Sequence, residues 1–142
     1  MKLVDANVLI YAVNPDTERH IEAKTWLDRA MSGGATVGLT WLVLLAFIRL
    51  TTKRGLFPQP LTIDDAMAIV AQWIELPSTV IVEPGHRHLA LMAELSETCE
   101  VTGNLVNDLH LAAIAVEHRA EIVSYDSDFD RFDRVRWERP AS

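Results

Sequence analysis

The segment Lys2-Leu3-Val4-Asp5 places a carboxylate directly after a short apolar run that is typical of a buried strand. The same arrangement returns near the other end of the chain, where Ile122-Val123-Ser124-Tyr125 precedes Asp126 and Asp128. Asp108 opens a third apolar-rich run, which predicts a helix. Ligands of open α/β sheets bind outside the carboxyl ends of the strands. Acidic side chains in these positions therefore indicate a candidate site.

Between these segments, apolar strands and helices alternate along the chain. We expect strands at residues 2–4, 36–39, 80–82 and 121–124, with a last short one at 135–137. We expect helices at residues 18–31, 41–53, 62–74, 86–97 and 107–119. Short apolar strands separated by helices are typical of a parallel sheet covered on both faces. The sequence thus predicts an α/β fold with a central parallel sheet flanked by helices.

Length, charge and cysteine content narrow the class of protein. A chain of 142 residues fits one domain, residues 1–142, and 49% hydrophobic and 23% charged residues are ordinary for a globular protein. The net charge of −7 argues against generic nucleic-acid affinity, although a local basic patch remains compatible with it. Cys99 is the only cysteine, which excludes an internal disulfide and favours a reduced, cytoplasmic location.

We expect neither a signal peptide at the N-terminus nor a membrane span in the longest apolar run. The N-terminus reaches Asp5 before any apolar stretch builds up, unlike a signal peptide. The longest apolar run, Trp41 to Ile48, falls well short of the roughly 20 residues of a membrane span. Because this run is apolar on all sides, we expect it to be either deeply buried or part of a dimer contact.

Each acidic residue has an ordinary reading as well as a functional one. Asp5 is as well suited to capping the next helix as to binding a metal. Asp108, taken alone, is an acidic residue in the first turn of a helix, where the helix dipole favours negative charge. Asp126-Ser127-Asp128, taken alone, is an ordinary polar turn. Gathered at one edge of a sheet, however, these carboxylates repel one another unless a proton or a cation intervenes. Oxygen-only ligands suit hard cations such as Mg²⁺ or Mn²⁺. We therefore predict an acidic metal pocket.

Four segments carry a family resemblance that covers essentially the whole chain. Residues 1–10 (MKLVDANVLI) resemble the opening of PIN-domain ribonucleases, and residues 103–113 (GNLVNDLHLAA) look like their central motif. Residues 123–129 (VSYDSDF) are similar to their C-terminal acidic motif, and residues 41–51 (WLVLLAFIRLT) to the helix between. Order, spacing and length resemble the VapC toxins of bacterial type II toxin–antitoxin pairs.

The resemblance implies a PIN-like three-layer fold and a Mg²⁺-dependent endoribonuclease, with Mn²⁺ as a possible substitute, that cleaves RNA with a metal-activated water. It implies a VapB-type antitoxin as partner and a homodimer. The implied catalytic and metal-binding residues are Asp5, Asp108 and Asp126, with Asp128 as a further metal ligand and Asn7, Arg49 and Asn104 in support.

One position departs from the family pattern. Ala46 stands where many PIN domains carry a glutamate, just before their Phe-x-Arg element, so the number of bound metals stays open. A catalytically silent PIN domain that binds RNA or protein is therefore the main alternative. A receiver domain is disfavoured because the first strand ends in a single acid, Asp5, and no lysine follows Lys53. A phosphatase is disfavoured because its acidic pair usually follows the first strand.

Basic and histidine residues are the remaining candidates. Arg49 ends an apolar helix and is expected to face the site or the antitoxin, and the arginines between Arg131 and Arg139 are candidates for holding an RNA backbone. His86 and His88 occupy alternate helical positions that do not share a face, so we expect both on the surface. His110 is expected to point away from Asp108.

Overall fold

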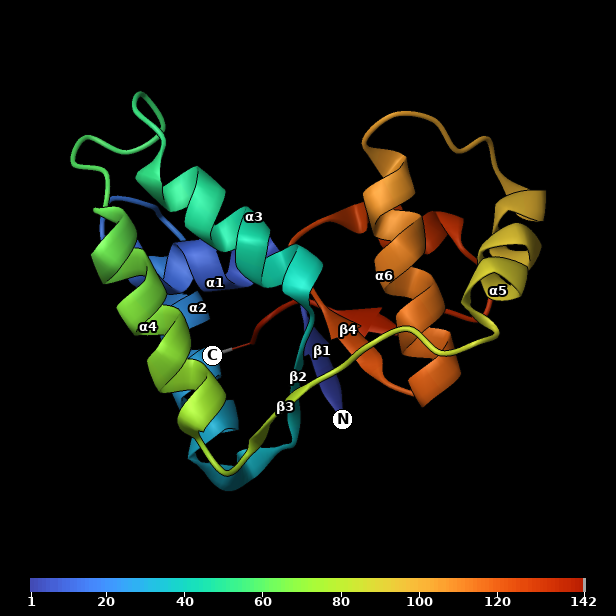
Figure 1. Cartoon of the computed structure of the whole chain (residues 1–142), viewed down its shortest axis with the longest axis horizontal. Coiled ribbons are helices and arrows are strands. Elements are labelled where there is room, and N and C mark those ends of the chain that lie inside the picture. Colours follow the sequence, from blue (N-terminus) through green and yellow to red (C-terminus); the bar gives the residue numbers. More distant parts are fainter. Residues whose placement is uncertain (142) are drawn as a thin grey trace.

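Five short strands form one parallel sheet in the order β3-β2-β1-β4-β5 (Figure 1). The computed structural model describes residues 1–141. The strands are β1 (Lys2–Val4), β2 (Val37–Leu39), β3 (Thr79–Ile81), β4 (Glu121–Val123) and β5 (Trp137–Glu138). In the central register, Leu3 lies opposite Gly38 on one side and Ile122 on the other. The first and the fourth strand are therefore direct neighbours, and their carboxyl ends lie side by side.

Helices flank this sheet in two groups (Figure 1). Helix α1 packs against α2 and α3, and α3 packs against α4, whereas α5 packs against α6 on the other side. The predicted α/β fold with a parallel sheet between helical layers is thus confirmed. The helices are α1 (Ala6–Val13), α2 (His20–Arg29), α3 (Trp41–Thr52), α4 (Ile63–Glu75), α5 (His88–Leu95) and α6 (Leu105–His118), with short turns η1 (Ala30–Gly34), η2 (Ser96–Thr98) and η3 (Ser127–Arg131).

Local signals explain where the helices begin and end. The hydroxyl oxygen of Thr40 accepts a hydrogen bond from the amide of Val43 at 3.2 Å, and that of Thr62 accepts one from Asp65 at 3.1 Å. Both threonines are N-caps, and the predicted helices 41–53 and 62–74 begin within one residue of α3 and α4. The predicted helix 18–31 instead begins at His20 and closes in a π-type turn that ends near Gly33, whose φ of 103° favours glycine.

The hydrophobic core lies on both faces of the central strands. Leu3 and Val4 are wholly buried, as are Phe47 of α3 and Ile114 of α6. The Phe47 ring also meets Trp73 edge-on, with centroids 4.9 Å apart. The apolar run on α3 is only partly buried, because Trp41 and Leu45 keep 47% and 59% of their surface exposed. One side of α3 therefore packs into the core while another faces solvent.

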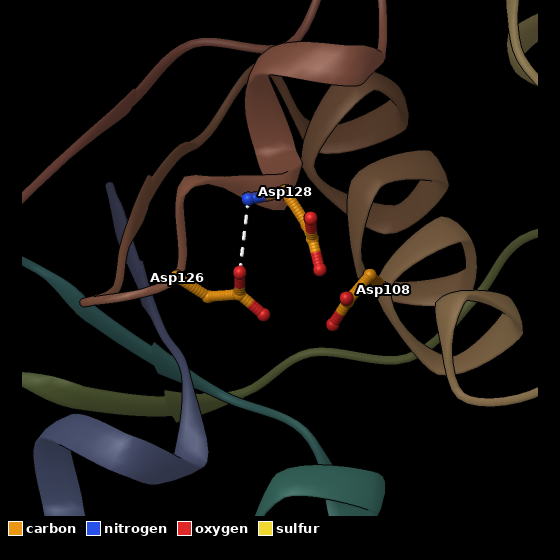
Figure 2. A group of neighbouring side chains, drawn as sticks. All are labelled: Asp108, Asp126 and Asp128. Atoms are coloured by element: carbon orange, nitrogen blue, oxygen red, sulfur yellow. Dashed lines mark hydrogen bonds between the residues drawn. The ribbon is translucent and has the colours of Figure 1, made fainter.

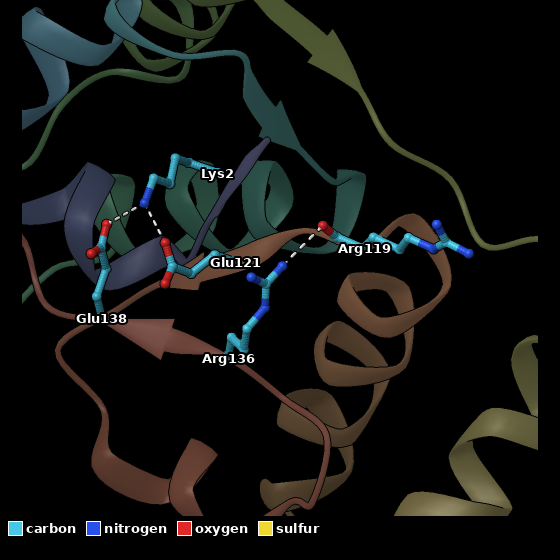
Figure 3. Close-up of polar contacts among 5 residues, drawn as sticks. All are labelled: Lys2, Arg119, Glu121, Arg136 and Glu138. Carbon is cyan, nitrogen blue, oxygen red and sulfur yellow. Dashed lines mark hydrogen bonds and ion pairs between the residues drawn. The ribbon is translucent and has the colours of Figure 1, made fainter.

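An ion-pair network joins β1, β4 and β5 (Figure 3). Lys2 of β1 bonds to Glu121 of β4 and, at 2.6 Å, to Glu138 of β5. Burial alone would lower the pKa of Lys2, but the hydrogen bonds and charges of both glutamates raise it overall. Arg136 donates to the backbone oxygen of Arg119 at 3.4 Å. These contacts tie the three strands together.

None of the helices formed by residues 1–141 has the length and apolar character that a membrane crossing requires.

Candidate metal centre

Three of the four predicted acids meet at the carboxyl edge of the sheet (Figure 2). Asp126 follows β4, Asp128 lies on η3, and Asp108 lies in the first turn of α6. Each offers one carboxylate oxygen, and these oxygens lie within 4.8 Å of one another. All three side chains are partly buried. Together they form an oxygen-only set of the kind that hard cations prefer.

A short turn brings Asp128 back toward Asp126. The Asp126 carboxylate accepts a hydrogen bond from the amide of Asp128 at 2.9 Å and thereby caps η3 (Figure 2). The polar turn that the sequence alone would suggest is therefore present. The same turn directs both carboxylates toward Asp108, so the turn and the acidic group are one arrangement.

Asp5 is not part of this group of three, although it lines the same cavity. One of its oxygens accepts from the amide of Ala6 at 2.8 Å, as an N-cap of α1 does. The other accepts from the hydroxyl of Ser124 at 2.7 Å. Burial raises the pKa of Asp5, these two hydrogen bonds lower it in part, and the nearby charge of Asp126 raises it. The capping reading thus holds for one oxygen, while the other belongs to a polar network.

Ser124 is a residue of this network that the sequence argument missed. It is wholly buried and accepts hydrogen bonds from the amide of Asp126 at 3.0 Å and from the side-chain amide of Asn7 at 3.2 Å. Asn7 in turn accepts from the amide of Tyr125 at 3.1 Å. Ser124 and Asn7 therefore lock the end of β1 to the end of β4. The only signal in the sequence is a serine that interrupts an apolar strand.

A cavity of about 520 Å³ opens over the acids. Helix α3 contributes Ala46 and Arg49 to its wall, and the turn before α6 contributes Asn104. The structure thus gathers every predicted site residue at this cavity except Asn7, which acts behind Asp5 and Ser124. Ala46 lies at the cavity wall, where the missing glutamate of the family pattern would lie.

The negative charges that line the cavity favour the binding of a cation. Burial, followed by the charges of Asp126, Asp5 and Asp128, raises the pKa of Asp108 from 3.8 to about 7. Without a counter-ion, the Asp108 carboxyl is therefore partly protonated near neutral pH. Arg49 lines the cavity but forms no ion pair with these acids within the described residues 1–141. A divalent cation fits both the donor set and the unbalanced charge.

The histidines behave differently from one another. His86 is exposed, as predicted, but the prediction for His88 is wrong because its ring is partly buried. His88 Nε2 lies 2.8 Å from His110 Nδ1 and joins α5 to α6. His110 therefore contacts α5 and does not line the acidic cavity. These rings hold two helices together and stand apart from the candidate metal site.

Comparisons with known proteins agree with this geometry. A family model described as the PIN domain matches residues 2–135. Ribonuclease VapC37 of Mycobacterium tuberculosis is 56% identical over 142 residues, which cover 100% of this chain and 99% of that protein. Ribonuclease VapC25 of the same species is 39% identical over 140 residues, which cover 99% of each.

Solved structures show the same fold. VapC20 of Mycobacterium tuberculosis, described as a sarcin-ricin loop cleaving toxin, superposes with a TM-score of 0.67 at 19% identity and covers 96% of this chain and 99% of that one. VapBC2 from Rickettsia felis, solved bound to a DNA fragment from their promoter, gives a TM-score of 0.71 at 17% identity, with 97% of each chain covered. At these identities the likeness concerns the fold alone.

Proposed function

The chain belongs to the PIN-domain family and is similar over its full length to VapC ribonucleases, and we propose that it is the endoribonuclease toxin of a VapBC-type pair. The observation that carries the proposal is the convergence of Asp108, Asp126 and Asp128 on one cavity. Three carboxylates with a raised pKa among them form a binding site for a hard cation and have no evident role in packing.

The cation that we propose is Mg²⁺, with Mn²⁺ as a substitute of the same ligand preference. Asp108, Asp126 and Asp128 would hold it, and Asp5 would add negative charge from the β1 side of the cavity. When bound, Mg²⁺ supplies an activated water for attack on the phosphodiester and offsets charge that develops on the phosphorus oxygens. Because Ala46 provides no carboxylate, these four aspartates are the acidic residues that line the cavity within residues 1–141.

The other residues of the cavity would position the RNA. The guanidinium of Arg49 can hold a substrate phosphate by paired, charge-assisted hydrogen bonds. Asn104 offers an amide at the same wall. Leu42 and Leu105 add apolar surface to the lining of the cavity. In this arrangement the acids bind the cation, and the basic and amide groups bind the substrate.

A VapB-type antitoxin would cover the same cavity. Trp41 and Leu45 are exposed apolar side chains on α3, the helix that also carries Arg49. An antitoxin segment that packs on them would reach Arg49 with an acidic or carbonyl group and exclude RNA. The homodimer and the single-domain organisation of residues 1–142 remain predictions, which light scattering and limited proteolysis would test.

The alternative function is a catalytically silent domain that binds RNA or protein, and Ala46 at the cavity wall is the observation that favours it. Two experiments separate the functions. RNA 5′ ends are sequenced after induced expression of the wild type and of Asp5→Asn, and Mg²⁺-dependent cleavage is measured on purified protein. New 5′ ends with the wild type only, together with cleavage that requires Mg²⁺, support the nuclease. RNA binding without cleavage supports the silent domain.

A further inference from the structure

A second recess adjoins the acidic cavity. It has a volume of about 380 Å³ and is lined by Glu100, Thr102, Leu105, Asp128 and Arg131. Leu105 and Asp128 also line the acidic cavity, so the two spaces share a wall. A ligand that extends from the candidate metal centre along this wall enters the recess.

The polar groups of the recess are available to a ligand. Arg131 donates from Nε to the Asp128 carboxylate at 3.2 Å, which fixes the guanidinium while its side chain keeps 57% of its surface exposed. Its two terminal nitrogens form no hydrogen bond within residues 1–141, and neither do the side chains of Glu100 and Thr102. The recess therefore offers donors at Arg131, acceptors at Glu100 and either at Thr102.

The charge balance restricts what can occupy the recess. Two carboxylates, Glu100 and Asp128, face one guanidinium, so a phosphate group would meet net negative charge. Glu100 belongs to no group of three metal-ligating side chains among the described residues, which disfavours a second cation site. A neutral planar ring with both donors and acceptors satisfies the polar groups, and Leu105 gives it an apolar wall.

We propose that this recess binds a guanine base of the RNA next to the phosphate that is cleaved, and thereby selects the cleavage sequence. The proposal rests on the proposed ribonuclease function. Guanine matches the recess because arginine bonds to its O6 and N7 acceptors. A carboxylate such as that of Glu100 can accept from its N1–H and N2–H donors, since single-stranded bases expose these edges. Glu100 and Arg131 are thus the specificity-determining residues.

Base analogues test the two contacts separately. Fluorescein-labelled RNA pentamers carry guanosine, inosine or 7-deazaguanosine at one position, and binding to the full-length protein is measured by fluorescence anisotropy in EDTA, where no cleavage occurs. Inosine lacks the N2 amino group, and 7-deazaguanosine lacks N7. We expect the wild type to bind the guanosine pentamer about tenfold more tightly than either analogue. Glu100→Ala should lose the preference over inosine only, and Arg131→Ala the preference over 7-deazaguanosine.

Matched variants outside the recess control for general loss of charge. Glu97→Ala and Arg134→Ala remove the same charges from residues that do not line the recess, and both should keep the wild-type preferences. Equal binding of the three pentamers by the wild type, or unchanged preferences in Glu100→Ala, would overturn the proposal. Cleavage of random-sequence RNA in Mg²⁺ is measured in parallel. Absence of cleavage contradicts the proposed function, whereas the binding preferences judge the recess alone.

Discussion

Replacing Ser124 with alanine tests whether the hydroxyl holds the acids in place. The substitution removes the donor that lies 2.7 Å from Asp5 and the acceptor that lies 3.0 Å from the amide of Asp126 and 3.2 Å from the side-chain amide of Asn7. A hydrogen bond to a charged group is worth about 2 kcal/mol and a neutral one about 1 kcal/mol. We therefore expect the free energy of unfolding of the metal-free protein to fall by about 4 kcal/mol at pH 8. That loss lowers Tm by about 12 °C for a domain of this size.

The loss should depend on pH in a defined direction. The folded pKa of Asp5 already lies above its ordinary value of 3.8, so ionisation of Asp5 costs stability as the pH rises through the folded pKa. The Ser124 hydrogen bond favours the ionised form, so its removal raises that pKa further and enlarges the cost at high pH. Toward pH 4, where more of the carboxyl is protonated, the three lost hydrogen bonds approach neutral ones of about 1 kcal/mol each, and the drop in Tm should shrink to about 9 °C.

Thermal melts from pH 4 to pH 8 on the metal-free protein measure the effect. Ser124→Thr is the matched control because it keeps the hydroxyl. Its extra methyl in a wholly buried position should cost stability equally at every pH. An alanine deficit that is the same at pH 4 and pH 8 would refute the reasoning, since Ser124 would then contribute packing only.

Three further predictions concern the cavity itself. Because the folded pKa of Asp108 is raised to about 7, the metal-free wild type should lose stability between pH 4 and pH 7. The Tm of Asp108→Asn should depend less on pH over that range and should rise little when Mg²⁺ is added. A variant whose Tm responds to pH and to Mg²⁺ as strongly as that of the wild type contradicts this prediction. Ala46→Glu should tighten Mn²⁺ binding in calorimetric titration, and unchanged affinity with a large drop in Tm would place the side chain in the core. Arg49→Ala should weaken RNA cleavage and reduce antitoxin affinity by about 1–3 kcal/mol, with partial recovery in Arg49→Lys, whereas two unchanged values would make Arg49 a solvated helix end.

The sequence predicts the elements better than it predicts their neighbours. Apolar runs marked the strands, and the predicted helices 41–53 and 62–74 begin within one residue of α3 and α4, whose N-caps are Thr40 and Thr62. No element is assigned from the sequence to residues 7–13, since a short apolar run suits either a strand or a buried helix, and the structure places them in α1. Helix α6 begins at Leu105 and not at 107, because carbonyl groups of the preceding turn accept from its first amides.

Contacts between segments far apart in the chain explain why the sequence analysis missed some residues of the site. Ser124 is an ordinary polar residue until β4 lies beside β1, and only then does its hydroxyl reach Asp5. In the same way, Glu100 and Arg131 share a recess only because α6 and η3 are packed together. The acids themselves were predictable because each follows a strand or opens a helix, which is a local pattern. The residues that contact these acids, such as Ser124, depend on the order of the strands in the sheet, which no local sequence pattern specifies.

The absence of an acid at Ala46 has a structural counterpart on the opposite side of the cavity. The hydrogen bond from the Asp128 amide to Asp126 folds η3 so that a single turn supplies two carboxylates. The oxygen set therefore comes from α6 and one strand–turn segment and does not depend on α3. Because α3 supplies no metal ligand, it lines the cavity with Ala46, which leaves space for a phosphate, and with Arg49, which can bind that phosphate through its positive charge. Loss of the family's glutamate is thus compatible with a working metal site, provided that the Asp126–Asp128 turn is kept.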